Sequence, residues 1–128
     1  MQNDSIVKSS TSRNTEITQQ YFNFLDRHID DVVNGRVSEF LEINQVASEL
    51  AVSHKHLTDT VQKEVGNHPC HFYDLKIIEV AKKMLINTDL SIAEIARKLT
   101  YDPSNFSKFF KNWVLGKTPG QFRKEHKK

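Results

Sequence analysis

The sequence contains few of the residues that would cross-link a fold or hold it in a membrane. Its one cysteine, Cys70, excludes an intramolecular disulfide and is typical of a reducing compartment. No stretch approaches the ~20 apolar residues that a membrane-spanning helix needs, and the polar start from Met1 to Glu16 lacks the apolar core of a secretion signal. We therefore expect a cytoplasmic protein without a membrane partner.

Patterns typical of catalysis and of cofactor binding are also missing. There is no glycine-rich phosphate loop and no pair of carboxylates at a spacing recognisable from acid–base catalysis. The histidines and Cys70 lack the paired spacing of zinc ligands, so we interpret them as solvent-facing or hydrogen-bonded side chains. The sequence thus favours a binding protein, not an enzyme, with no metal ion and no cofactor.

Charge is distributed unevenly along the chain. The first 96 residues hold nine Lys and Arg against 14 Asp and Glu, a balance of −5. Residues 97–128 hold nine against two, a balance of +7. This asymmetry favours a polyanion such as nucleic acid as the partner of the C-terminal part, ahead of a merely solvated basic tail at Lys124, Lys127 and Lys128.

Hydrophobic periodicity and helix caps predict an all-α fold. Residues 1–16 are rich in Ser, Thr, Asn and Gln and contain almost nothing to bury, so we expect a disordered tail there. Ser53 and Ser91 are placed as N-caps, and Gly66 is placed as a C-cap. The predicted helices cover residues 17–33, 43–50, 54–65, 71–86, 92–98 and 105–111, and Pro119 begins a turn into a further helix.

The regions before and after residues 71–86 repeat one pattern. Each copy has a small alanine in a short helix and a large apolar residue ten positions later in the next helix, as the core of a helix-turn-helix requires. The matched pairs at an offset of 49 are Val46-Ala47 with Ile95-Ala96, Leu50 with Leu99, Leu57 with Phe106 and Val61 with Phe110. At an offset of 50 they are Gly66 with Gly116, Pro69 with Pro119 and Phe72 with Phe122.

The repeat predicts two helix-turn-helix lobes, over 17–70 and 87–128. The helix at 71–86 is apolar nearly all round and must be buried on more than one side. At about 1.5 Å per residue it spans ~24 Å, enough to join two small lobes.

Three strings carry a family resemblance: Ser91-Ile92-Ala93-Glu94-Ile95-Ala96, then Asp102-Pro103-Ser104-Asn105-Phe106-Ser107-Lys108-Phe109-Phe110-Lys111, then Gly116-Lys117-Thr118-Pro119 with Phe122-Arg123. With them, residues 17–125 resemble the C-terminal DNA-binding domain of AraC/XylS-type transcription regulators. The resemblance implies a two-lobe fold of about seven helices that binds DNA as a monomer, with one helix of each lobe in successive major grooves.

The resemblance also bears on what the protein does. Members of this family usually activate transcription near RNA polymerase, so we expect a DNA-binding activator. The length leaves no room for an added effector domain, and we expect either the stand-alone small form or a DNA-binding fragment of a larger effector-controlled regulator.

Matching the chain to the family position by position implies which side chains meet DNA. Those expected at base edges are Lys55, Thr58 and Asp59 in the first copy and Ser104, Asn105, Ser107 and Lys108 in the second. Those expected at phosphates are His54, Lys63, Lys111 and Lys117. Lysine can donate to guanine and asparagine can pair with adenine, whereas aspartate can accept from cytosine N4 but repels phosphate.

The sequence departs from the family pattern around the second copy. Leu99-Thr100-Tyr101-Asp102 is one residue shorter than usual, and Trp113-Val114-Leu115-Gly116 is one residue longer. We therefore expect the second recognition helix to be shifted along the chain. Asp59 and Ile77 stand where the family often has arginine.

One short motif suggests an enzyme instead. Pro69-Cys70-His71 is similar to the reactive core of DNA alkyltransferases, in which a histidine-activated cysteine takes up an alkyl group. In the repeat this tripeptide occupies the place of Pro119-Gly120-Gln121, a turn into a helix, and nothing else resembles that enzyme.

The acidic first part of the chain supports another alternative, a helical module that binds a protein rather than DNA. Salt-dependent duplex binding distinguishes the two, because a protein-only module would show none.

Overall fold

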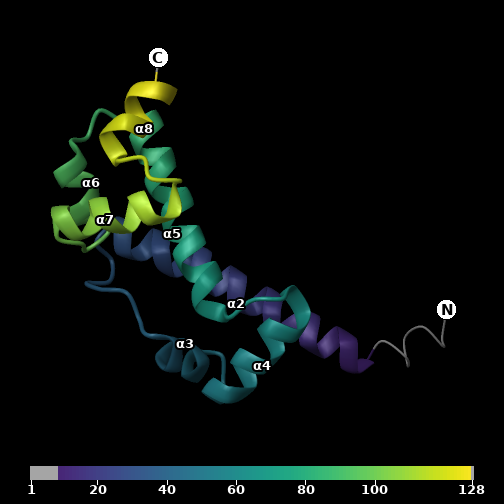
Figure 1. The fold of residues 1–128 in the computed structure, drawn as a ribbon. Helices are drawn as coiled ribbons and strands as arrows, with labels where there is room; N and C mark the ends of the chain where they lie inside the picture. The colour runs from purple at the N-terminus through teal and green to yellow at the C-terminus, as the bar shows by residue number, and fades with distance from the viewer. Residues whose placement is uncertain (1–8, 128) are drawn as a thin grey trace. The chain divides into compact units, whose positions relative to one another are not determined.

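The computed structural model describes residues 9–127, with side chains from residue 13 onward. Every regular element in these residues is an α-helix, which confirms the predicted all-α class (Figure 1). The seven helices of this described part are α2 (Ser9–Val33), α3 (Ile43–Glu49), α4 (His54–Val65), α5 (Pro69–Asn87), α6 (Ile92–Lys98), α7 (Pro103–Trp113) and α8 (Pro119–His126).

The predicted start of the first helix is wrong. α2 begins at Ser9, so the predicted disorder of 1–16 fails from residue 9 onward, while residues 1–8 lie outside the described part. Once a helix is nucleated, each added residue gains one backbone hydrogen bond, so a polar segment can extend it without an apolar face. A tertiary hydrogen bond adds to this, since the Thr15 hydroxyl donates to the Glu64 carboxylate at 2.6 Å.

The helices group into two compact units. The first unit comprises the described residues as far as Arg27 together with Leu41–Tyr73, and the second comprises His28–Phe40 together with the residues from Asp74 onward. Both α2 and α5 continue across this division, so each contributes residues to two cores. The boundary between the two units therefore falls within helices rather than between them. The predicted division into lobes 17–70 and 87–128 with a linker helix 71–86 stays a prediction.

The core of the first unit is built from α2, α3, α4 and the start of α5, where Tyr73 is buried. Tyr21 of α2, Ala47 of α3, and Leu57 and Val61 of α4 are all buried. The Tyr21 hydroxyl, which burial would otherwise leave without water, donates to the backbone carbonyl of Pro69 at 2.8 Å. α4 therefore turns its Leu57 side inward, and its opposite face is left for solvent or a partner.

The core of the second unit contains an aromatic cluster formed by α7 and α8. Phe106 and Phe110 of α7 are both 0% exposed, which confirms that they face inward. Their ring centroids lie 5.9 Å apart, and Phe110 meets Phe122 of α8 edge-on at 5.6 Å. Aromatic rings pack favourably at such separations and angles. The contact between Phe110 and Phe122 therefore holds α7 against α8.

The helix ends carry the caps that the sequence predicts. The Ser53 hydroxyl accepts from the His56 amide at 3.0 Å, and Gly66 ends α4 in the left-handed conformation, with φ of 83°. At α6 the Ser91 hydroxyl accepts from the Glu94 amide at 3.0 Å and the Glu94 carboxylate accepts from the Ser91 amide at 2.8 Å. Such a reciprocal capping box satisfies two amides that the helix itself leaves unpaired.

The two helix-turn-helix turns share one backbone conformation. Ala51, after α3, has φ of 59°, and Thr100, 49 positions later and after α6, has φ of 62°. The next residue in each turn donates to the buried alanine of the preceding helix, Val52 to the Ala47 carbonyl at 3.0 Å and Tyr101 to the Ala96 carbonyl at 2.8 Å. The repeat predicted from apolar residues is therefore also a repeat of the main chain.

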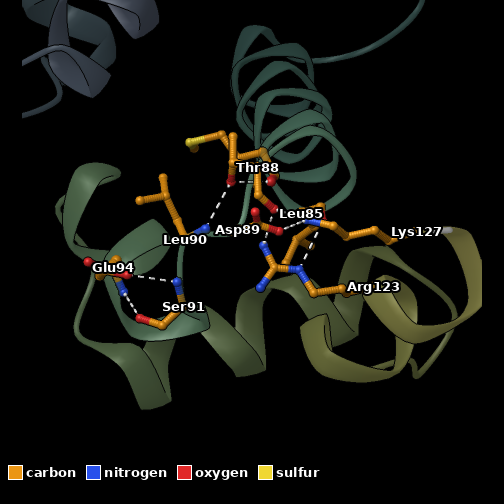
Figure 2. A network of polar contacts seen from close by, with 9 residues as sticks. Leu85, Thr88, Asp89, Leu90, Ser91, Glu94, Arg123 and Lys127 are labelled. Atoms are coloured by element: carbon orange, nitrogen blue, oxygen red, sulfur yellow. Dashed lines mark hydrogen bonds and ion pairs between the residues drawn. The ribbon is translucent and has the colours of Figure 1, made fainter.

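In the second unit, Arg123 of α8 and Lys127, which follows α8, bind the C-terminal end of α5 and the loop after it (Figure 2). The Arg123 guanidinium donates to the Leu85 carbonyl at 2.9 Å and to the Thr88 carbonyl at 3.1 Å. Lys127 donates to the same Thr88 carbonyl and to the Asp89 carboxylate. The last carbonyls of a helix lack intrahelical partners and favour positive charge, so this cluster fixes the loop that leads into α6.

We predict that replacing Thr100 by glycine stabilises the protein. A β-branched residue with positive φ is strained, and glycine relieves that strain at a smaller entropic cost, for a net gain of about 1 kcal/mol in the free energy of unfolding. Denaturant unfolding measures it. Ala51→Gly should gain less because alanine is not β-branched, and Ala93→Gly inside α6 should lose about 1 kcal/mol. A Thr100→Gly variant no more stable than the parent would contradict the strain.

Candidate nucleic-acid interface

The second helix of each unit starts on an equivalent residue. Ser53 caps α4 and Asp102 caps α7, at an offset of 49, and Pro103 occupies the first turn of α7, where its missing amide costs nothing. Leu57 and Phe106, also related by this offset, are both 0% exposed. The two helices therefore have the same rotation relative to their own cores and present equivalent positions outward.

α7 keeps the register of α4 at the offset of 49, and the shift of the second recognition helix relative to the family pattern stays a prediction. The extra residue lies in the turn after α7, where Leu115 and Gly116 have φ of 49° and 80°. Leu115 is 96% exposed, so this longer turn bulges into solvent and leaves the buried residues of α7 in register.

Most predicted DNA contacts of the first copy lie exposed along α4, and Thr58 is half-buried. The Lys55 ammonium lies 2.8 Å from the Asp59 carboxylate, one helical turn away, with the two side chains 85% and 61% exposed. This hydrogen bond lowers the pKa of Asp59 and raises the pKa of Lys55. Both groups are therefore charged at neutral pH, and α4 presents an ion pair rather than two independent charges.

The DNA contacts predicted from the sequence do not include His56. This residue is exposed on the first turn of α4 and corresponds to Asn105 of α7 at the offset of 49. The repeat itself is the signal that identifies it. His56 also adds to the lowering of the Asp59 pKa, although Lys55 is the main cause.

The predicted contacts of the second copy lie along α7, where Ser104, Asn105, Lys108 and Lys111 are exposed and Ser107 is half-buried. The Ser104 hydroxyl donates to the Asp102 carboxylate at 2.8 Å, and the Ser104 amide donates to it at 3.1 Å. Hydrogen bonds from the Ser104 side chain and the Asn105 amide lower the pKa of Asp102, and the charge of Lys108 adds to this. Ser104 therefore serves the cap as well as the outward face.

Some basic side chains of the C-terminal part already have intramolecular partners. Lys117, predicted to contact phosphate, lies away from α7 in the turn before α8 and pairs with Glu125. Lys127 pairs with Asp89 at 2.6 Å and is only 28% exposed, whereas Lys124 is exposed. The positive charge nearest the outward face of α7 is thus carried by Lys108 and Lys111.

Tyr101 supports the start of α7 from within the turn. Its ring stacks on Phe109 with the centroids 5.2 Å apart. Burial, followed by the negative charge of Asp74, raises the pKa of Tyr101 to about 12, so the phenol stays neutral at any pH at which the protein would be studied.

The chain is similar to known proteins in both sequence and fold. None of the described helices is long and apolar enough to cross a membrane. A family model described as a helix-turn-helix domain matches residues 46–125, more than half of the chain. The chain is 28% identical over 126 residues to the helix-turn-helix-type transcriptional regulator YtdP of Bacillus subtilis (strain 168), and the match covers 98% of this chain and 16% of that protein.

Two solved structures have a similar fold. The C-terminal domain of AraT, a response regulator from Geobacillus stearothermophilus, is 27% identical with a TM-score of 0.75, and the match covers 88% of this chain and 87% of that one. The DNA-binding domain of AdpA, a global transcriptional factor solved in complex with a target DNA, is 20% identical with a TM-score of 0.61, covers 77% and 91% of the two chains, and shows the fold alone. The chain spans 16% and 30% of the length of two curated relatives that it matches.

We predict that the cap of α7 makes stability depend on pH. The folded pKa of Asp102 lies below its ordinary value of 3.8, so the charged cap contributes stability above that value, and the contribution disappears as pH falls through the folded pKa. Asparagine also caps helices but does not titrate here. The parent should therefore exceed Asp102→Asn in unfolding free energy at pH 7, and the difference should shrink towards pH 3.

Chemical denaturation across this pH range measures the difference. Ser53→Asn at the equivalent cap of α4 is the matched control, because neither side chain titrates and the difference should stay constant. If the difference in unfolding free energy between the parent and Asp102→Asn does not change with pH, the charge of Asp102 does not stabilise the cap.

Proposed function

Since the chain belongs to the AraC/XylS-type family of DNA-binding helix-turn-helix transcription regulators, we propose that it binds one duplex site as a monomer through the outward faces of α4 and α7. The observation that carries the proposal is the equivalence of these helices. They start 49 residues apart on caps, bury equivalent side chains and present polar residues at equivalent outward positions. A helix of this kind fits the major groove.

Recognition by one chain with two such helices requires an asymmetric site. The helices would enter successive major-groove segments about one helical turn, ~34 Å, apart. A monomer has no two-fold axis, so the two half-sites need not be related by a palindrome. Phosphate contacts would come from His54, Lys63, Lys111 and Lys117, with Lys117 exchanging Glu125 for a phosphate.

We further propose that the second unit supplies more of the affinity. Lys108 and Lys111 of α7 lie within a part of the chain whose charge balance is +7, whereas Lys55 on α4 is paired with Asp59. Affinity for duplex DNA grows with the number of phosphates neutralised and the counterions released. The first unit, which is acidic, would then contribute chiefly by discriminating between sequences.

The regulatory role that we propose is activation through RNA polymerase. Support comes from the family, whose members usually activate transcription near the polymerase. Transcription in vitro from a promoter carrying the selected site, with purified polymerase, tests the role: a rise in full-length transcript is expected, and a fall would make the protein a repressor.

Binding by a monomer to two groove segments is directly testable. Selection from random duplexes followed by footprinting should give an asymmetric site protected over two major-groove segments, and sedimentation should give one chain per duplex. Affinity should fall steeply with added salt. Strict dependence on a palindrome, or protection confined to one segment, contradicts this arrangement, and salt-independent or absent binding would favour a protein-interaction module.

Lys108→Ala should weaken discrimination between the selected site and a random duplex by about 1 to 3 kcal/mol, because a side chain at a base edge is lost. Dissociation constants on both duplexes measure the effect. Lys124→Ala, which removes one exposed cation from α8, is the control and should leave the ratio of the two constants unchanged. Equal losses on both duplexes for Lys108→Ala would make this residue a phosphate contact.

A further inference from the structure

At the position of Asp59, the exposed faces of α4 and α7 carry opposite charges. At the offset of 49 it corresponds to Lys108 of α7, which is also exposed. Around it, Lys55 holds the Asp59 carboxylate at 2.8 Å, and His56 lies on the same turn of the helix. A carboxylate on a helix that approaches DNA is repelled by phosphate, so its presence there calls for a base that favours it.

The hydrogen-bond donors and acceptors in the major groove indicate which base the Asp59 carboxylate can bind. A carboxylate can only accept hydrogen bonds, and the groove offers it two kinds of donor, the amino groups of cytosine and of adenine. In adenine the N7 acceptor lies beside the amino group and would repel the carboxylate, whereas cytosine has no acceptor next to its N4 in the groove. Cytosine is therefore the better partner for Asp59.

The partner of that cytosine matches Lys55. Guanine presents two acceptors, O6 and N7, and an ammonium group can donate to both while keeping one hydrogen for Asp59. Within the base pair, cytosine N4 already donates to guanine O6 at an ordinary hydrogen-bond distance of about 2.9 Å. The distance of 2.8 Å between the Lys55 nitrogen and the Asp59 oxygen is close to this value. The side-chain pair and the base pair can thus close one ring of hydrogen bonds.

We propose that Lys55 and Asp59 act as a unit that reads one C·G base pair in the half-site of the first unit, with Asp59 on cytosine N4 and Lys55 on guanine. This inference rests on the proposed function, since it requires α4 to face the major groove. The ion pair is not broken on binding but shared with the bases. Because the pair carries no net charge, it adds specificity with little counterion release.

The test is base selection by variants of the whole chain. Each protein selects from duplexes randomised over the first half-site, and affinities are then measured on duplexes that differ at the one position. The parent should prefer C·G by on the order of tenfold. Asp59→Asn should change the preference towards A·T, because an amide can pair with adenine N6 and N7. Lys55→Ala should lose the preference.

Glu49→Gln provides the matched control. Glu49 is exposed on α3 of the same unit, and its replacement removes one negative charge as Asp59→Asn does. It should raise affinity for all duplexes alike without changing base preference. The inference is wrong if Asp59→Asn, like Glu49→Gln, leaves the base preference unchanged. It is also wrong if the parent selects no C·G pair in this half-site, and in both cases the proposed DNA binding is unaffected. If the parent binds no duplex, the proposed function fails and the inference with it.

Discussion

The arrangement of both units depends on the close packing of two helices beside a buried alanine. α3 packs on α4 and α6 on α7, with Ala47 and Ala96 only 1% and 0% exposed. Protein cores are packed as densely as crystals, so a larger side chain at either alanine would force the helices apart. The packing fixes how α4 and α7 are rotated about their own axes. It therefore decides which side chains of α4 and α7 face outward, and the DNA contacts proposed for these two helices follow from it.

Many of the helix boundaries could be predicted from residues close to them in the sequence. Ser53 and Ser91 are serines directly before a run with helical periodicity, and each one caps a helix at the predicted place. The start of α2 could not be predicted from the residues around it. Residues 9–16 have no apolar face, and their helical state depends on propagation from the buried segment that follows and on the hydrogen bond from Thr15 to Glu64, 49 residues away.

The correspondence between α4 and α7 could be predicted from the repeat, whereas the ion pairs of the basic side chains could not. Because the repeat aligns α4 with α7, burial of Phe106 tells which positions face outward, and the same alignment would have included His56. The partners of Lys117 and Lys127 could not be read in this way. Lys117 pairs with a residue of the next helix, and Lys127 with Asp89, 38 residues away, through tertiary packing that hydrophobic periodicity does not contain.

α2 and α5 each contribute residues to two cores, and this sharing bears on how the protein loses its structure. A unit joined to its neighbour by a flexible linker can melt by itself, and a mixture of states then builds up during denaturation. Here the melting of either core would leave part of two helices without packing, and helical segments that short are marginal in water. We therefore expect unfolding of one unit to weaken the other through these two continuous helices.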